Sequence, residues 1–167
     1  MEKSEVLGVL VDELKLAASN LERSIQAAKE KFKTKAEKLV EQYQKHRISN
    51  NKEHPAKEKS KLGLQVGTGR GGLQIKWYTT YRYQAVFDGP VLTGRQWIPI
   101  NKRQLGSRDS TLKRSSMPWQ QDKVEEIERA ATGIRKTVAV LMEIDYHLRC
   151  LEKLAIKLGQ PDSQILK

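Results

Sequence analysis

Apolar residues recur at helical spacing in two long stretches, one near each end of the chain. In the first stretch, apolar or small side chains follow one another mostly at steps of four and three: Leu7, Val11, Leu14, Ala18, Leu21, Ile25, Ala28, Phe32, Ala36, Leu39 and Tyr43. Down to Phe32 this is the heptad spacing that keeps one seam of a helix against a partner helix. Lys35 occupies the next seam position, where the seam weakens. The pattern predicts a long helix within residues 1–47.

The second helical stretch covers residues 118–159. Pro118 suits a first helical turn, and Gly159 followed by Pro161 is typical of a helix end. The apolar stripe of this helix, which Asp145 interrupts, consists of Val124, Ile127, Ala131, Ile134, Val138, Leu141, Leu148, Leu151, Leu154, Ala155 and Leu158. Residues 160–167 are expected to form a mobile tail.

Period-two alternation predicts three strands within residues 62–117. A short strand over 62–66 precedes a glycine-rich turn at 67–72, the strongest alternation covers 73–87, and a third strand candidate covers 91–100. In 73–87 the odd positions are mainly apolar or aromatic and the even positions polar or basic, so the sheet should have one apolar and one basic face. A strand of this length predicts a bulge or bend near Thr79. Pro99 favours an edge position for the third strand.

The remaining segments are predicted to be irregular. Residues 48–61 have no apolar period and are interpreted as a flexible basic linker, and residues 101–117 as a basic loop. The predicted fold class is therefore α+β, with a small antiparallel β-sheet flanked by two long helices in the order α-β-β-β-α. The helices are expected to pair as an antiparallel or a dimeric coiled coil.

All of the net charge lies in the middle of the chain. Residues 1–43 contain 8 Lys and Arg against 8 Asp and Glu, and residues 119–167 contain the same numbers. Residues 44–118 contain 15 basic against 4 acidic residues, which accounts for the whole net charge of +11. An unbalanced basic segment that also has strand patterning favours an anionic partner such as nucleic acid.

The basic strand face is the main candidate site. Lysine and arginine neutralise phosphates, arginine and glutamine can recognise guanine and adenine edges, and a two-stranded ribbon fits a major groove. The predicted DNA-binding residues are Arg70, Gln74, Lys76, Tyr78, Arg82, Arg95, Lys102, Arg103, Arg108, Lys113 and Arg114. The alternative is an ordinary solvated sheet face. The aromatic side chains Trp77, Tyr81, Tyr83 and Phe87 are expected to pack as core beneath a helix rather than to stack on bases, because the cations lie on the opposite face.

Other chemistries find little support in the sequence. The Gly67–Gly72 stretch precedes a strand rather than the helix N-terminus that a phosphate-binding loop needs, so a hairpin turn is expected. The three histidines are scattered, Cys150 is the single cysteine, and acidic residues such as Glu125, Glu126 and Glu128 are assigned to a solvated helix surface. No catalytic residue, metal or cofactor is predicted. The absence of a signal-peptide pattern and of an apolar stretch near the roughly 20 residues of a membrane span predicts a cytoplasmic protein without a membrane partner.

Several segments together resemble a known family. The stretch Gly72–Tyr78 with Tyr81-Arg82-Tyr83, then Trp97-Ile98-Pro99-Ile100, a basic loop, and Trp119 opening a helix that carries Glu128 and Arg135, is similar to MobI, a conjugative transfer protein of plasmids and integrative elements. The likeness covers residues 62–145. It implies a non-catalytic auxiliary factor for the DNA transfer origin that acts beside a separate relaxase.

The sequence thus predicts a sequence-specific double-stranded DNA-binding protein, expected to be a homodimer. Two alternatives remain open: a coiled-coil adaptor whose N-terminal seam recruits a partner helix, and an RNA-binding protein. A role at a membrane surface is least favoured because the helices are charge-balanced.

Overall fold

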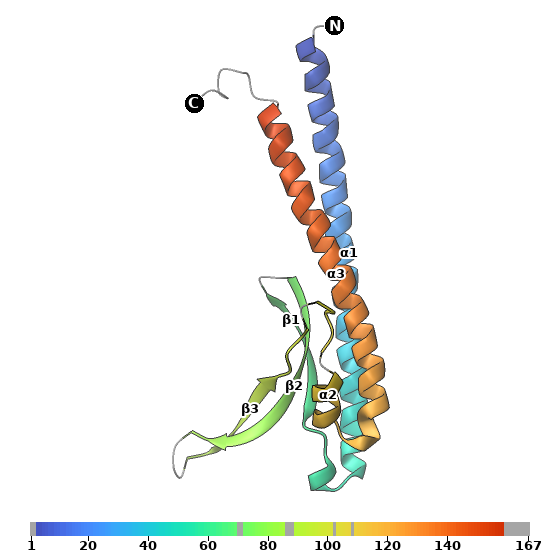
Figure 1. Ribbon diagram of the computed structural model, residues 1–167, viewed down its shortest axis with the longest axis vertical. Coiled ribbons are helices and arrows are strands. Elements are labelled where there is room, and N and C mark those ends of the chain that lie inside the picture. Colours follow the sequence, from blue (N-terminus) through green and yellow to red (C-terminus); the bar gives the residue numbers. More distant parts are fainter. Residues whose placement is uncertain (1–2, 70–71, 86–88, 102, 108, 159–167) are drawn as a thin grey trace. The chain divides into compact units, whose positions relative to one another are not determined.

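The computed structural model of the protein describes residues 3–69, 72–85, 89–101, 103–107 and 109–158 (Figure 1). The elements are, in order, α1 (Lys3–Glu53), a 3-10 turn (Ala56–Glu58), β1 (Leu62–Gly69), β2 (Gly72–Gln84), β3 (Val91–Trp97), α2 (Asp109–Ser115), a second 3-10 turn (Pro118–Gln120) and α3 (Gln121–Leu158). The three strands form one antiparallel sheet in the order β1-β2-β3. The predicted α+β class is confirmed. Phe87 and the predicted tail, residues 160–167, lie outside the described residues.

Helix α1 continues six residues beyond its predicted end, so the linker prediction is wrong for residues 48–53. Their polar side chains still make specific contacts. Asn51 Nδ2 donates to the Ser60 carbonyl at 3.3 Å, and the Ser60 amide donates to Asn51 Oδ1 at 2.7 Å. Arg47 donates from Nη1 to the Leu62 carbonyl at 3.1 Å. These bonds tie the end of α1 to the start of β1.

The chain divides into two compact units, and both long helices contribute to each. Unit 1 comprises residues 1–31 and 139–167, and unit 2 comprises residues 32–138. Unit 2 contains the sheet, α2 and the adjoining parts of α1 and α3.

The sheet in unit 2 has an uninterrupted register. Pairing between β1 and β2 runs from Leu62↔Thr79 to Gly69↔Gly72, and pairing between β2 and β3 runs from Tyr78↔Trp97 to Gln84↔Val91. The predicted bulge near Thr79 is wrong, because successive residues of β2 pair with successive residues of β1 and of β3 there. The alternative, a bend, stays a prediction. The edge position predicted for the third strand is confirmed, although β3 ends at Trp97, before Pro99.

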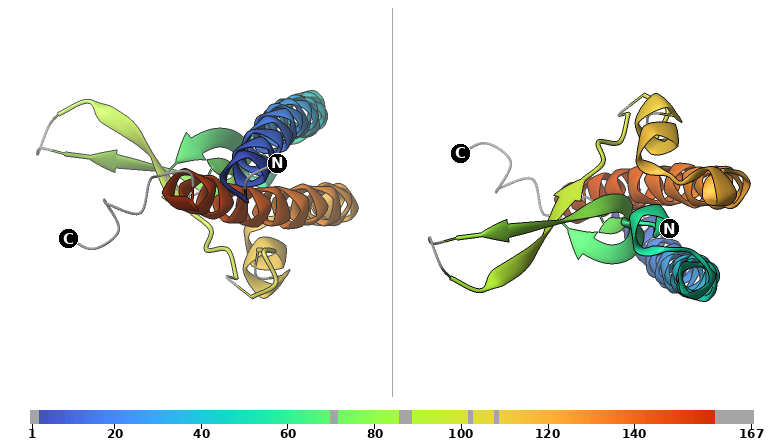
Figure 2. Two further views of the ribbon diagram at one scale, coloured as in Figure 1. Left: turned by 90° about the horizontal axis from the view of Figure 1, so that it is seen from above. Right: turned by 90° about the horizontal axis from the view of Figure 1, so that it is seen from below.

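Beyond Thr79 only β2 and β3 remain paired, which leaves a two-stranded ribbon of residues 80–84 and 91–95. This ribbon leads away from the helices (Figures 1 and 2).

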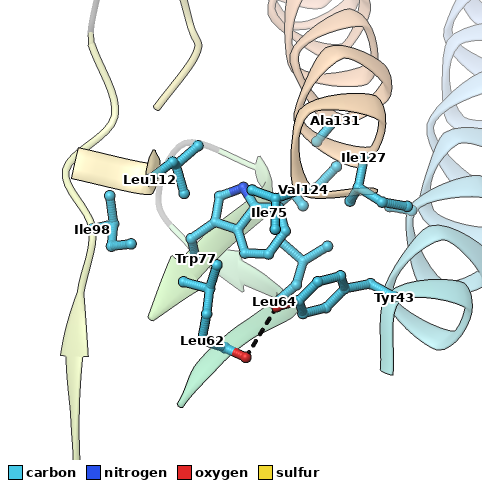
Figure 3. Close-up of a cluster of buried hydrophobic side chains, with 11 residues drawn as sticks. Tyr43, Leu62, Leu64, Ile75, Trp77, Ile98, Leu112, Val124, Ile127 and Ala131 are labelled. Carbon is cyan, nitrogen blue, oxygen red and sulfur yellow. Dashed lines mark hydrogen bonds between the residues drawn. The ribbon is translucent and has the colours of Figure 1, made fainter. Parts of the chain in front are cut away.

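The core of unit 2 lies between the apolar face of the sheet and the helices (Figure 3). It consists of Ala36, Tyr43, Leu62, Leu64, Ile75, Trp77, Ile98, Leu112, Val124, Ile127 and Ala131. The Tyr43 and Trp77 rings meet edge to face with centroids 4.7 Å apart, and the Tyr43 hydroxyl donates to the Leu62 carbonyl at 3.2 Å. Burial raises the pKa of Tyr43 above its ordinary value, so the hydroxyl keeps its proton. Each large core side chain contributes about 1.5–3 kcal/mol through burial.

A buried ion pair fastens the sheet and the 101–107 loop to α3. Glu128 and Arg135 are each 7% exposed, and Arg135 Nη1 lies 2.9 Å from Glu128 Oε1. Glu128 also accepts hydrogen bonds from the Trp77 indole and the Ser107 amide, both at 2.6 Å. Arg135 donates to the carbonyls of Ile75 and Leu105 at 2.9 and 3.1 Å. The assignment of Glu128 to a solvated surface is thus wrong.

Electrostatics keep the Glu128 carboxylate ionised in this setting. Burial by itself raises the pKa of Glu128, but the hydrogen bonds and charge of Arg135, with the bonds from Ser107 and Trp77, outweigh it and lower the pKa below its ordinary value. The carboxylate therefore accepts from all of these donors at neutral pH.

Unit 1 is an antiparallel pair formed by the ends of α1 and α3. Ala18 and Ile25 pack with Leu148, and Lys29 bonds Asp145 at 2.9 Å. The Asp145 that interrupts the apolar stripe thus has a partner on the other helix, and Arg149 also pairs with it. The hydrogen bond from Lys29 and the contact with Arg149 lower the pKa of Asp145 against the opposing effect of burial. Pairing as a coiled coil stays a prediction.

Candidate nucleic-acid interface

The register of the sheet brings five of the predicted DNA-binding residues to one face. We call this surface the basic face; it consists of Gln74, Lys76, Tyr78, Thr80, Arg82 and Gln84 of β2 with Thr93, Arg95 and Trp97 of β3. It alternates with the core face, which begins with the buried Ile75 and Trp77. Near Ile75 and Trp77, the helices cover the core face. The ribbon, with its part of the basic face, extends beyond the helices.

Arg95 is held in place on the basic face by its neighbours. Its guanidinium carbon lies 4.7 Å from the centroid of the Tyr78 ring, and its Nη1 donates to Gln65 Oε1 at 2.6 Å. Cation–π contact and the hydrogen bond restrict the side chain before any ligand arrives. Arg95 nevertheless remains exposed, so its remaining donors can reach an anion.

Tyr78 supports this arrangement rather than presenting a free ring. It is only 6% exposed, and its ring meets that of Trp97 at a centroid distance of 5.5 Å. Gly63 faces it on β1, where a Cβ atom would come within 2.3 Å of the Tyr78 ring. The glycine therefore makes room for the aromatic side chain on which Arg95 rests.

Trp97 was absent from the predicted set of DNA-binding residues. It is 47% exposed and lies on the basic face beside Tyr78. The sequence of β3 already indicates this position. Trp97 lies two residues after Arg95, and residues two apart in a strand share a face.

A groove of about 590 Å³ adjoins the basic face at its α1 side, where Tyr78, Gln65 and Arg95 line it together with residues of α1. Two of these are the carboxylates Glu37 and Glu41. Glu41 pairs with Lys45 at 2.7 Å, and the hydrogen bond and charge of Lys45 lower its pKa. Because these acidic groups lie at the α1 side, the ribbon and the Lys76 region are the parts best suited to a polyanion.

The other predicted contacts in the described part of the chain lie outside the sheet. Lys113 and Arg114 lie in the last turn of α2, and Arg103 lies in the loop before it; all three are exposed. Arg70, Lys102 and Arg108 lie outside the described residues. A cavity of about 800 Å³ beside α2 is lined by Lys113, Arg129 and Lys136 but also by Asp109, Asp122, Glu125 and Glu128. Four carboxylates face three cations in this lining, so the cavity has no preference for anions.

The expectation that Tyr81 and Tyr83 form core is wrong. They lie on the core-facing side of β2, but at 48% and 42% exposure, because the ribbon extends past the helices that cover Trp77. Tyr81 packs over Gly94, where a Cβ atom would come within 2.5 Å of its ring. The ribbon therefore presents a basic surface on one side and an aromatic one on the other.

The structure assigns two histidines to packing. His46 and His54 lie beside Trp119, with ring centroids 5.9 and 5.0 Å away. Within the described ranges, no three His, Cys, Asp or Glu side chains gather closely enough to bind a metal ion. Within those ranges, too, every helix is too short or too polar to cross a bilayer.

A comparison with protein-family models gives a match over most of the chain. The family model described as MobI protein matches residues 32–149, which include all of unit 2. The chain belongs to the MobI family. Membership implies a conjugative mobilisation accessory protein. Searches of the curated proteins and of the solved structures found no match to this MobI chain.

Proposed function

We propose that this MobI protein is a non-catalytic factor that binds double-stranded DNA at a transfer origin and assists a relaxase. The observation that carries the proposal is the coincidence of charge and shape in unit 2. Residues 44–118 contain the whole net charge of +11, and the register places Lys76, Arg82 and Arg95 on one face of a sheet that ends in a ribbon. Family membership independently supports a role in DNA mobilisation.

The ribbon suits insertion into a groove. A two-stranded antiparallel ribbon fits the width of the major groove of B-DNA. Arg82 is exposed within the ribbon, so it is the residue that we expect to reach base edges, where arginine can pair with guanine through two hydrogen bonds. Gln74, Lys76 and the pre-positioned Arg95 would bind neighbouring phosphates or bases, with Tyr78 as the support for Arg95.

Further contacts would come from the loop and from α2. Arg103, Lys113 and Arg114 are exposed cations that we assign to phosphates, together with Arg70, Lys102 and Arg108 from the predicted set. Phosphate contacts determine affinity and orientation, whereas base contacts determine sequence preference. We further propose a cytoplasmic homodimer, since two copies of the ribbon related by a two-fold axis favour a repeated or palindromic site.

A second candidate function is a protein-interaction adaptor. It is favoured by the apolar side chains that unit 1 leaves exposed, among them Leu16 at 62% and Leu154 at 59%. RNA binding is a third candidate, because phosphate recognition does not by itself distinguish the two nucleic acids. Salt dependence and competition discriminate among these functions.

The experiment is fluorescence anisotropy of labelled duplex DNA with the full chain across a salt series. With six to ten phosphate contacts, the logarithm of the association constant should fall against the logarithm of salt concentration with a slope of about −5 to −9. Duplex DNA should compete better than duplex RNA of the same length. Salt-independent binding, absence of binding at low salt, or stronger competition by RNA would refute the proposal.

A further inference from the structure

Unit 1 leaves two heptad-spaced apolar stripes uncovered. On α1 the stripe consists of Leu10, Leu14, Ala17 and Leu21, in which the leucines are 55%, 43% and 45% exposed. On α3 it consists of Val140, Ile144, Leu151 and Leu154, which are 54%, 40%, 52% and 59% exposed, with His147 in register between them. Steps of three and four along a helix are typical of a seam that faces another helix.

Both stripes lie on the same face of the helix pair. On α1, Leu14 lies four positions before the buried Ala18, and Leu21 lies four positions before the buried Ile25. On α3, Ile144 and Leu151 precede the buried Leu148 and Ala155 by the same four positions. Each stripe is therefore rotated from the line of contact in the same sense along its own helix. Because the two helices are antiparallel, rotation in the same sense brings both stripes to one side of the pair.

This face, which we call the stripe face, is large enough for a stable interface. Its seven large apolar side chains are about half exposed, which leaves roughly 600 Å² per chain, and two copies would bury on the order of 1,200 Å², the lower end of specific interfaces. By contrast, the buried apolar side chains in the described part of the pair are Val11, Ala18, Ile25, Leu148 and Ala155, of which two are alanines. A helix pair with so small an internal cluster gains most by covering its remaining apolar surface.

The charge distribution favours a second copy of the chain as the occupant. Residues 1–31 contain 5 Lys and Arg against 6 Asp and Glu, and residues 139–167 contain 4 of each. Unit 1 thus has a net charge of −1, so two copies of it repel each other little, whereas the excess of cations lies in residues 44–118. Two stripes on one face also match two stripes on an identical face after a two-fold rotation, as an isologous interface requires.

We propose that two copies of this chain dock through the stripe face of unit 1 and form a four-helix bundle. The stripe face consists of residues outside the proposed DNA-binding set, so this interface can be refuted without refuting DNA binding.

The test is the mass of the full chain in solution, measured by light scattering or sedimentation across micromolar concentrations. The chain of 19.1 kDa should give twice its mass. The variant Leu14→Lys with Leu151→Lys should give a monomer that keeps its helical circular dichroism. The matched control Leu16→Lys with Tyr146→Lys alters side chains that are more exposed, at 62% and 65%, but lie off both stripes; it should stay a dimer.

Three results would overturn the inference: a monomeric wild type, a stripe-face variant that dimerises as well as the wild type, or a control that dissociates as fully as the stripe-face variant. A monomeric wild type that binds DNA would refute this interface and the proposed homodimer but leave the proposed DNA binding standing. A dimeric wild type without affinity for DNA would refute the proposed DNA binding and leave this interface standing.

Discussion

Loss of one partner from the buried pair of Glu128 and Arg135 should strongly destabilise unit 2. The substitution Glu128→Gln keeps the shape of the side chain but removes its charge, and it turns one acceptor oxygen into a donor. Arg135 is 7% exposed, so its charge would stay buried without a carboxylate. The Trp77 indole and the Ser107 amide, which donate to Glu128 at 2.6 Å, would have to share one remaining oxygen.

Removal of one partner from a buried ion pair typically costs about 3–5 kcal/mol, because an uncompensated charge remains. Domain stabilities are about 5–15 kcal/mol, so the variant should lose at least about a fifth of its stability. For a unit of this size, at about 4 °C per kcal/mol, Tm should fall by on the order of 12–20 °C.

Urea unfolding followed by tryptophan fluorescence and circular dichroism measures this loss. The control is Glu125→Gln, on the same helix, whose partner Arg129 lies 3.3 Å away with both side chains mostly exposed; it should change stability by less than about 0.5 kcal/mol. The double variant Glu128→Leu with Arg135→Met should be more stable than Glu128→Leu alone, since no charge is left unpaired. A Glu128→Gln variant within about 1 kcal/mol of the control would refute the reasoning.

Two further predictions concern pH and packing. The folded-state pKa of Glu128 lies below its ordinary 4.5, so the stability that this group contributes is complete above pH 4.5 and is lost as the pH falls towards the folded-state pKa. Below pH 4.5, the urea midpoint of the wild type should therefore fall more steeply with pH than that of Glu128→Gln. Parallel curves for the two proteins would contradict this. Gly63→Ala would place a Cβ atom 2.3 Å from the buried Tyr78 ring and should lower the free energy of unfolding by about 1–3 kcal/mol. Gly67→Ala on the same strand, where no atom lies within 4 Å, should change it little; equal effects of the two substitutions would refute the packing argument.

Periodicity predicted the order of the elements and the faces of the sheet, but not how far the helices cover them. Alternation correctly put Trp77 and Tyr81 on one side of β2, yet Trp77 is fully buried and Tyr81 is 48% exposed. The difference depends on where α1 and α3 pass over the sheet, which is a tertiary property. Likewise, residues 48–53 resembled a linker because they are polar, although Asn51 makes specific bonds to Ser60.

The buried ion pair could have been found in the sequence. Glu128 lies four residues after Val124, and Arg135 four residues after Ala131, so both fall on the apolar stripe of their helix. Oppositely charged residues two turns apart on a buried face need partners. Their further bonds to Trp77 and Ser107 depend on tertiary contacts that spacing does not specify.

The central claim is that the basic face binds DNA, and a matched pair of charge reversals tests it most directly. The first variant is Lys76→Glu with Arg82→Glu, and the second is Lys38→Glu with Lys153→Glu on the exposed, charge-balanced helices; both lower the net charge equally. Anisotropy on the same duplex should show a loss of affinity of at least about thirtyfold for the first variant, with a salt slope shallower by about 2, while the second stays close to wild type. Equal losses in both variants, or none in the first, would contradict a DNA-binding surface on the basic face.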